Sequence, residues 1–421
     1  MKPHESSDSR RQFLKKSLMV PVTFGAAPGL AFAQAAAPEK EAAAPAEEAA
    51  AAPAGGLPPV PTRKLGRSGV QVSMINLGGA MGAHSPQYLN LAWSMGIRYF
   101  DTADCYMGGR SEQHIAEWLE KYPERRKDVF IVTKAHPHEG PKQLLTQIDE
   151  RLKACGTDYI DLFFIHWINP EEYGQASLEW PRSQELKEVA EQLKKSGKIK
   201  LFGFSAHHKE KAQYMEAAAA GGFIDAIMVA YSPFLPPSDE LSRALDACHK
   251  AGIGLISMKE MRALGELPKR VPAFDKLGMT SHQVLLHACW SDERIASVCS
   301  AMENAQQMKE NTEAARSYQK PLDIATRERL RDLALASRPS MCPNCDGRCE
   351  RAAGKALALN DIARYVTYYE RDGNIEARQW YQALAAELRD ARGADLAAAH
   401  HACLCHLDFA SILRKAEEYF A

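Results

Sequence analysis

The feature that most constrains this chain is an alternation of short apolar segments with longer segments of helical period, between Arg63 and about Arg338. This pattern predicts repeated β/α units and a parallel sheet. A hairpin is expected first, over RKLGRSGVQVS. Eight strands are expected after it, in the segments MINLGG from Met74, RYFDTA from Arg98, DVFIVTKA from Asp128, YIDLFFIHW from Tyr159, KIKLFGFSA from Lys198, DAIMVAYSP from Asp225, IGLISMKE from Ile253 and IASVCSAM from Ile295.

The segments between these strands have helix signatures. LKEVAEQLKKSG has apolar residues at helical spacing and ends on Gly197, and SEQHIAEWLEKYP opens with Ser111 and ends near Pro123. An open doubly wound sheet usually needs fewer strands and a glycine-rich turn after its first strand, which INLGGAMG matches poorly. The expected fold class is therefore α/β, a closed (β/α)8 TIM barrel with functional residues at the carboxyl ends of its strands.

Length and charge limit the organisation and the partners. A chain of 421 residues exceeds one ordinary domain, whereas a β/α barrel fills about 250 residues, so we expect one large domain with appendages. Lys and Arg total 52 against 53 for Asp and Glu, which gives a formal charge of -1. No overall positive field favours nucleic acid, and we exclude it as a partner.

The N-terminus has the composition of an export signal. A basic stretch contains the pair Arg10 and Arg11, an apolar stretch follows, and Ala31-Phe32-Ala33 is a small-x-small cleavage site. This order predicts a twin-arginine signal peptide over residues 1–33, recognition by the twin-arginine export machinery and a periplasmic location. A membrane anchor is the alternative if the signal stays uncleaved, although Gly25 and Pro28-Gly29 interrupt the apolar stretch.

Residues 34–61 are nearly all Ala, Pro and Glu, a composition that buries too little apolar surface to order itself. We expect a disordered linker there, the barrel over residues 62–338 and a small, mostly helical, cysteine-rich C-terminal domain over residues 339–421.

Polar residues follow three successive expected strands. Asp101 ends the second strand, Tyr106 lies in the loop after it, Lys134 ends the third and His166 ends the fourth. Each residue alone has an ordinary structural explanation. Since the carboxyl ends of barrel strands meet at one mouth, all four are expected to converge on one site.

The segments FDTADCY, VTKAH and DLFFIHW resemble the active-site segments of the aldo-keto reductase family, and the resemblance covers roughly Arg63 to Tyr318. It implies an NAD(P)-dependent oxidoreductase that moves a hydride between a nicotinamide and a carbonyl or alcohol. In that chemistry Tyr106 is the general acid and base. The pKa of a free phenol is about 10, and Lys134, held by Asp101, is expected to lower the pKa of Tyr106. His166 is expected to donate a hydrogen bond to the substrate oxygen.

The resemblance also implies cofactor contacts. Tyr231 is expected to stack on the nicotinamide and Ser205 to bind its carboxamide, whereas Ala206 and Met228 stand where the family carries amide side chains. Glu310 and Asn311 match the adenine segment. Ala301 and Gln307 stand where NADP-preferring members carry Lys and Arg, so both NADP and NAD stay open.

Five of the ten cysteines lie near the C-terminus, at Cys342, Cys345, Cys349, Cys403 and Cys405. Thiols at these spacings are typical of an iron-sulfur cluster, of structural zinc with His400, His401 or His406, or of disulfides in an oxidising compartment. The residues alone leave all three open.

The tail resembles the ferredoxin-like extension of one aldo-keto reductase branch, which includes twin-arginine members. Glu350-Arg351-Ala352 replaces the Cys-Pro that usually follows the third cysteine, so two clusters are not expected. The resemblance implies one [4Fe-4S] cluster held by Cys342, Cys345, Cys349 and Cys403, for electron relay or structure.

The leading expectation is thus an exported carbonyl or alcohol oxidoreductase with a possible redox partner. The alternatives are a non-catalytic barrel that serves as a binding or electron-transfer scaffold, and a reductase stabilised by zinc or disulfides. The loops at 167–181 and 233–238 mix aromatic and proline residues, which indicates a partly apolar pocket and no particular substrate.

Overall fold

A computed structural model describes residues 56–80, 85–234, 238–260, 269–337, 341–343 and 345–421. The expected signal peptide and almost all of the expected linker lie outside these residues. Among the helices described, none combines the length and the apolar composition that a membrane crossing requires.

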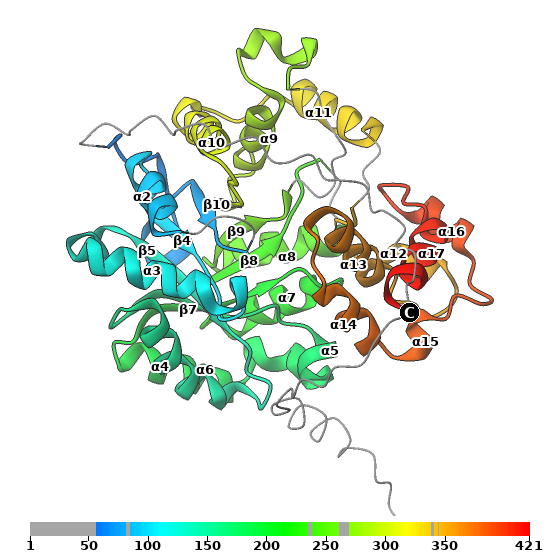
Figure 1. The fold of residues 1–421 in the computed structure, drawn as a ribbon, viewed down its shortest axis with the longest axis horizontal. Coiled ribbons are helices and arrows are strands. Elements are labelled where there is room, and N and C mark those ends of the chain that lie inside the picture. The colour runs from blue at the N-terminus through cyan, green and yellow to red at the C-terminus, as the bar shows by residue number, and fades with distance from the viewer. Residues whose placement is uncertain (1–55, 81–84, 235–237, 261–268, 338–340, 344) are drawn as a thin grey trace, which may run out of the picture. The chain divides into compact units, whose positions relative to one another are not determined.

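Eight parallel strands form a closed barrel (Figure 1), which confirms the predicted fold class. The strands are β3 (Ile75–Gly78), β4 (Tyr99–Asp101), β5 (Phe130–Ala135), β6 (Ile160–Ile165), β7 (Ile199–Ala206), β8 (Ala226–Ala230), β9 (Gly254–Met258) and β10 (Ile295–Ser300). Each strand pairs with the next along the chain, and β10 pairs with β3 to close the ring. Each lies inside a segment that the alternation marked as a strand.

A hairpin of β1 (Thr62–Lys64) and β2 (Gln71–Ser73) precedes the barrel, as expected. Leu65 and Val72 pack with the side chains that fill the barrel interior, such as Leu162 and Ile256. The guanidinium of Arg63 donates to two backbone carbonyls of the last repeat at 2.7 and 2.8 Å. The hairpin therefore packs against the barrel at the end opposite the carboxyl ends of the strands.

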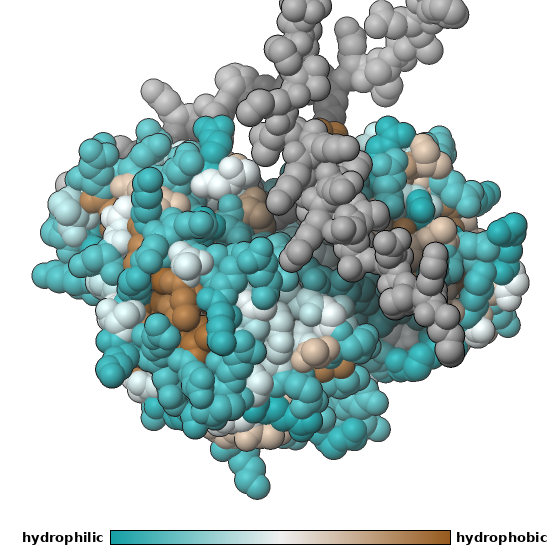
Figure 2. All heavy atoms as spheres, turned by 90° about the horizontal axis from the view of Figure 1, so that it is seen from below, coloured by the Kyte–Doolittle hydropathy of each residue, from teal (hydrophilic) through white to brown (hydrophobic). Residues whose placement is uncertain are grey.

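Helices surround the barrel, and several of them bury one face. In α6 (Gln184–Lys195), Ser183 caps the N-terminus by accepting from the Leu186 N–H, and the buried residues Leu186, Val189, Ala190 and Leu193 recur at helical spacing. The others are α2 (Pro86–Ser94), α3 (Arg110–Lys121), α4 (Leu144–Cys155), α7 (Lys211–Gly221), α8 (Asp239–Lys250), α9 (Ser281–Trp290), α10 (Ala305–Ser317) and α11 (Ile324–Ala336). The face of the molecule drawn in Figure 2 is correspondingly mostly hydrophilic.

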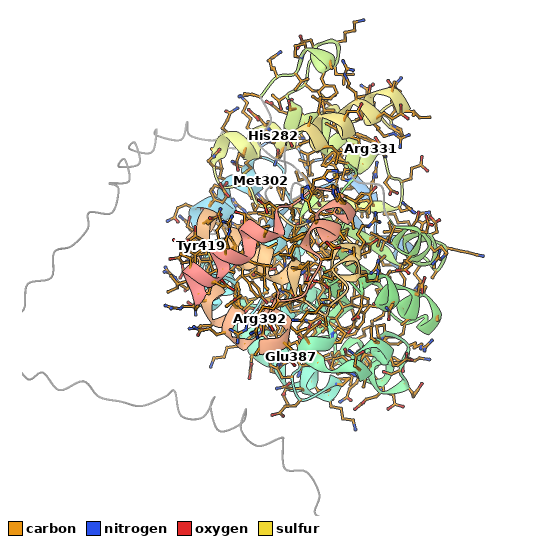
Figure 3. The ribbon with its side chains drawn as sticks, turned by 90° about the vertical axis from the view of Figure 1, so that its right-hand side faces the viewer. His282, Met302, Arg331, Glu387, Arg392 and Tyr419 are labelled. Atoms are coloured by element: carbon orange, nitrogen blue, oxygen red, sulfur yellow. The ribbon has the colours of Figure 1, made fainter. Side chains whose placement is uncertain are left out.

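The tail is helical, in agreement with the predicted C-terminal helical region. It consists of α12 (Arg348–Ala352), α13 (Leu359–Asp372), α14 (Glu376–Ala383), α15 (Ala386–Arg389), α16 (Leu396–Ala402) and α17 (Phe409–Phe420). These helices share a hydrophobic core of their own, which includes Ile362, Phe409 and Phe420. Figure 3 shows α17, with Tyr419, and the segment from Glu387 to Arg392 on the side of the molecule that faces the viewer.

The tail is also fixed to the barrel by polar contacts. Lys209, before α7, pairs with Glu350 of α12 at 2.9 Å. The buried ammonium of Lys211 donates to the backbone carbonyl of Cys345. The buried Arg364 of α13 lies over the ring of Trp167, 5.3 Å from its centroid. The tail thus contacts the loops that follow β6 and β7, next to the barrel mouth.

Candidate active site

The structure brings the four predicted site residues to one cavity. Asp101 and Lys134 lie at the carboxyl ends of β4 and β5, Tyr106 begins a 3₁₀ turn over Tyr106–Gly109, and His166 follows β6 directly. All four line a cavity of about 1690 Å³. The parallel strands cause this convergence, because their carboxyl ends meet at the same rim.

Lys134 is the centre of the arrangement. Its ammonium donates to Asp101 Oδ1 and to the Thr102 carbonyl, both at 2.7 Å, and lies 3.4 Å from the Tyr106 hydroxyl. The side chains of Lys134 and Asp101 are almost completely buried. Since a buried charge is costly unless it is paired, the ammonium and the carboxylate stabilise each other here.

Burial dominates the proton affinities at this site. The pKa of Tyr106 is raised well above 10, first by desolvation and then by the negative charge of Asp101. Burial therefore outweighs the lowering expected from Lys134, and the phenol stays protonated at neutral pH. Desolvation likewise raises the pKa of Asp101, against the opposing effect of Lys134.

His166 is held as a neutral ring. Its backbone N–H donates to the Ala135 carbonyl at 2.9 Å, and its own carbonyl accepts from the Tyr173 hydroxyl at 2.8 Å. Burial lowers the pKa of His166 to about 3. The ring packs edge to face with Tyr106, with 5.3 Å between centroids. A neutral imidazole beside a protonated phenol gives two hydrogen-bond donors for one oxygen atom.

Of the residues predicted to bind the cofactor, only Ser205 lines the cavity. Its hydroxyl accepts from the Trp167 N–H at 2.9 Å. Tyr231 is not among the described residues that line the cavity: its hydroxyl donates to Asp292 at 2.9 Å, outside the barrel wall. Successive residues of a strand point to opposite sides, so Met228 of β8 faces the interior and Tyr231 does not. The structure therefore does not place Tyr231 for stacking.

Glu310 and Asn311 lie on α10, behind the cavity wall. Glu310 pairs with Lys269 at 2.9 Å, and Asn311 donates to the Ser300 hydroxyl at 3.1 Å. Ser300 itself lines the cavity. Asn311 thus supports the rim, and neither residue lines the cavity in this structure.

Sequence reasoning missed the contribution of the tail to this cavity. Side chains of α13, including Arg364, Tyr365 and Tyr368, line the same space as Tyr106 and His166. Sequence spacing marks an amphipathic helix at α13 but carries no signal for the surface on which it docks. Met258, at the end of β9, was also missed and lines the cavity.

The tail cysteines lie together in the tail core. Cys342, Cys349, Cys403 and Cys405 are buried, and Cys345 is half-buried. Burial, and then the neighbouring thiols of Cys342, Cys345 and Cys403, raise the pKa of Cys349. All five are free thiols in the structure. The predicted ligands are thus neighbours, although they come from segments more than fifty residues apart.

Replacing Lys134 by Met should leave the Asp101 carboxylate buried without its partner, and Asp101 Oδ2 already lacks a hydrogen bond among the described residues. We expect the free energy of unfolding to fall by about 3 to 5 kcal/mol in urea titrations. The Asp101→Asn/Lys134→Met double variant should lose less stability than Lys134→Met, because no unpaired carboxylate remains.

Lys200→Met is the control. It removes a half-exposed lysine whose ammonium lies 2.8 Å from Asp161, and the free energy of unfolding should fall by under about 1 kcal/mol. Equal losses in Lys134→Met and Lys200→Met would contradict this account.

The barrel is similar to known proteins. A sequence model described as the aldo/keto reductase family matches residues 82–320. The chain is 28% identical over 222 residues to the aldo-keto reductase yakc [NADP(+)] of Schizosaccharomyces pombe, a match that covers 47% of this chain and 60% of that protein. It is 25% identical over 285 residues to the L-galactose dehydrogenase of Arabidopsis thaliana, which covers 60% of this chain and 87% of that enzyme.

Solved structures have the same barrel. A thermostable aldo-keto reductase in complex with the inhibitor epalrestat is 25% identical, with a TM-score of 0.52 over 65% of this chain and 99% of that one. The aldo-keto reductase of Klebsiella pneumoniae in complex with NADPH is 22% identical, with a TM-score of 0.51 over 65% of this chain and 95% of that one. The match of the family model to more than half of the chain, on a closed eight-stranded barrel, shows that this protein belongs to the aldo/keto reductase family.

Proposed function

We propose that this protein is an oxidoreductase that moves a hydride between a nicotinamide and a small carbonyl or alcohol. The observation that carries the proposal is the buried Asp101–Lys134 pair with the Tyr106 hydroxyl 3.4 Å from the ammonium, at the mouth of the cavity. Such a pair holds a fixed positive charge where negative charge develops in the reaction.

Tyr106 is the proton donor in the direction of carbonyl reduction. Because its pKa is raised by burial, the phenol carries its proton at neutral pH and can hydrogen-bond to the carbonyl oxygen. As the proton leaves, negative charge appears on the phenol oxygen, where the ammonium of Lys134 stabilises it. His166 donates a second hydrogen bond to the same substrate oxygen. In alcohol oxidation the steps reverse, and Tyr106 is the base.

The cavity has room and surfaces for the nicotinamide, which supplies or accepts the hydride when bound. Gly78 and Gly79 line one wall, where the lack of side chains lets a ligand approach the backbone, and Met228 and Met258 give an apolar surface. Ser205 is the polar contact for the carboxamide. The names of relatives that bind NADP(+) or NADPH support NADP as the cofactor, and NAD remains the alternative.

Replacing Tyr106 by Phe should remove the transferable proton and leave the cavity shape. We expect kcat for reduction of an aromatic aldehyde to fall by at least about 100-fold, because general acid catalysis contributes on the order of 10² to 10⁴. NADPH affinity, measured by quenching of protein fluorescence, should change little.

The matched control is Tyr214→Phe. It removes a buried hydroxyl that hydrogen-bonds to Ser177, away from the cavity. Its activity should stay close to that of the parent. Full activity in Tyr106→Phe would remove Tyr106 from the mechanism. The alternative is a non-catalytic scaffold. Met228 and Ala206, which stand where the family carries amide side chains, and the position of Tyr231 motivate this alternative. It becomes the better account if the parent protein binds NADPH but neither reduces an aldehyde or ketone nor oxidises an alcohol.

The tail, proposed as a domain over residues 339–421, is assigned one [4Fe-4S] cluster on Cys342, Cys345, Cys349 and Cys403. Buried thiols that raise one another's pKa are unfavourable as thiolates until a cluster binds them. Lys211, whose pKa burial lowers to about 8, adds a cation beside Cys345. Cys403 interacts with Cys345 and Cys349, and Cys405 interacts with Cys342 and Cys345, so the choice of Cys403 rests on the resemblance of the tail to the ferredoxin-like extension.

The cysteines assigned to the cluster are close in sequence to residues that line the cavity. Met341 and Leu407 line the cavity, and they are neighbours in sequence of Cys342 and of the Cys403–Cys405 pair. This closeness supports an electron relay between the tail and the active site, with an external redox partner at the far side of the tail.

Replacing Cys403 by Ser should abolish the broad visible absorbance of the anaerobically purified protein and lower its iron content, because one ligand is lost. Cys405→Ser should keep both, and Cys248→Ser, a buried thiol in the barrel, is the second control. A colourless parent protein that contains zinc or disulfides would contradict the cluster assignment.

We further propose export to the periplasm by the twin-arginine route, which carries folded proteins with their cofactors. The support is the sequence SRRQFLKK with the cleavage site after Ala33. Outside the cytoplasm, nicotinamide must stay bound and be recycled in place, a task that the cluster can serve.

Changing Arg10 and Arg11 together to Lys keeps the charge but removes the pair that the export machinery recognises. We expect the protein to move from the periplasmic to the cytoplasmic fraction, as followed by immunoblotting. Changing Lys15 and Lys16 to Arg should leave it periplasmic. Unchanged export of the Arg10/Arg11 variant would contradict the twin-arginine assignment.

A further inference from the structure

A second group of metal-ligand side chains lies beside the acid-base residues. Asp104, Cys105, His136 and His166 each offer one ligand atom, and these four atoms all lie within 4.8 Å of one another. Asp104 and Cys105 precede Tyr106, His136 follows Lys134 by two residues, and His166 follows β6. The same barrel rim that assembles the acid-base site therefore assembles this group.

Asp104 is the acidic member of the group, and the guanidinium of Arg151 lies 3.7 Å from its Oδ2. Asp104 Oδ2 lies 3.0 Å from His136 Nδ1, a normal hydrogen bond. Asp104 Oδ1 is buried and has no hydrogen-bond partner among the described residues; His166 Nδ1 lies 3.8 Å from it, too far for one. A buried carboxylate oxygen without a partner costs free energy, which a cation at this point removes.

The role proposed for His166 sharpens this argument. If His166 donates through Nε2 to the substrate oxygen, its Nδ1 carries a lone pair in the neutral ring. That lone pair then faces Asp104 Oδ1 and the sulfur of Cys105, which lies 3.6 Å away. The thiol proton of Cys105 can bridge only two of these atoms, whereas a bound cation would satisfy all three together.

We propose that Asp104, Cys105, His136 and His166 bind one zinc ion next to Tyr106. Sulfur, imidazole and carboxylate are the ligands that zinc prefers, and four such groups complete a tetrahedral shell. With bonds of about 2.0 to 2.3 Å, neighbouring ligand atoms in such a shell are about 3.3 to 3.6 Å apart. Nδ1 of His166 lies 3.6 Å from Sγ of Cys105 and 3.8 Å from Oδ1 of Asp104, and all four ligand atoms lie within 4.8 Å of one another, so small side-chain shifts would complete the shell.

Zinc binding displaces the thiol proton of Cys105 to solvent, and the thiolate becomes the ligand. A metal on Nδ1 fixes the tautomer of His166 with its proton on Nε2, and it withdraws electron density from the ring. This consequence rests on the proposed function: the zinc would orient and strengthen the hydrogen bond from His166 to the substrate oxygen. The zinc site itself does not depend on turnover.

The test counts zinc in the full-length protein with its tail intact. After equilibration with zinc and removal of the excess, metal content is measured by plasma mass spectrometry for the parent, Cys105→Ser and Asp104→Asn/His136→Gln. We expect both variants to hold about one zinc ion per chain less than the parent. The parent and Cys105→Ser are also titrated with cobalt. When the spectrum of Cys105→Ser is subtracted from that of the parent, a thiolate-to-cobalt charge-transfer band should remain.

His138→Gln is the matched control, because His138 is exposed, stacks on His136 and supplies no ligand atom to the group. Its zinc content should equal that of the parent. Equal zinc in the parent and in both ligand variants would overturn the site, and so would an equal loss in His138→Gln. Metal counting needs no substrate, so a failure of this inference is distinct from a failure of the proposed function.

Discussion

The buried ion pair between Lys134 and Asp101 is the interaction on which the rest of the site depends. Two buried charges in the rim of the barrel are stable only together. The pairing of β4 with β5 brings their side chains together, with 2.7 Å between the ammonium and the carboxylate oxygen. The pair leaves one face of the ammonium toward the Tyr106 hydroxyl. A proton can therefore leave Tyr106 into a field prepared before substrate arrives, with no rearrangement of the protein.

The tail changes what this barrel can do. By placing α13 over the mouth, it walls the cavity that the strand ends open, and Arg364 stacks on Trp167 directly after His166. The acid-base residues and side chains of α13 thus line one cavity, so a change in the tail alters the surroundings of that cavity.

The barrel and the four acid-base residues could be predicted because both follow from local pattern: alternation gives the strands, and strand ends share a rim. Tyr231 shows where this reasoning fails. Its sequence position fits the cofactor pocket, but strand alternation turns it outward to Asp292. The pKa of Tyr106 is raised overall, because burial and then the charge of Asp101 dominate it, and burial cannot be read from neighbours in sequence. The docking of α13 on the barrel is a long-range contact without a local signal.

The most direct test of the account follows the hydride itself. The purified protein is given NADPH that carries deuterium on the transferable position of the nicotinamide, together with an aromatic aldehyde, and the alcohol product is analysed by mass spectrometry. The account predicts deuterium on the alcohol carbon, and at a fixed early time at least about 100-fold less labelled alcohol from Tyr106→Phe than from the parent. An unlabelled alcohol, or equal amounts of labelled alcohol from the parent and Tyr106→Phe at that time, would contradict it.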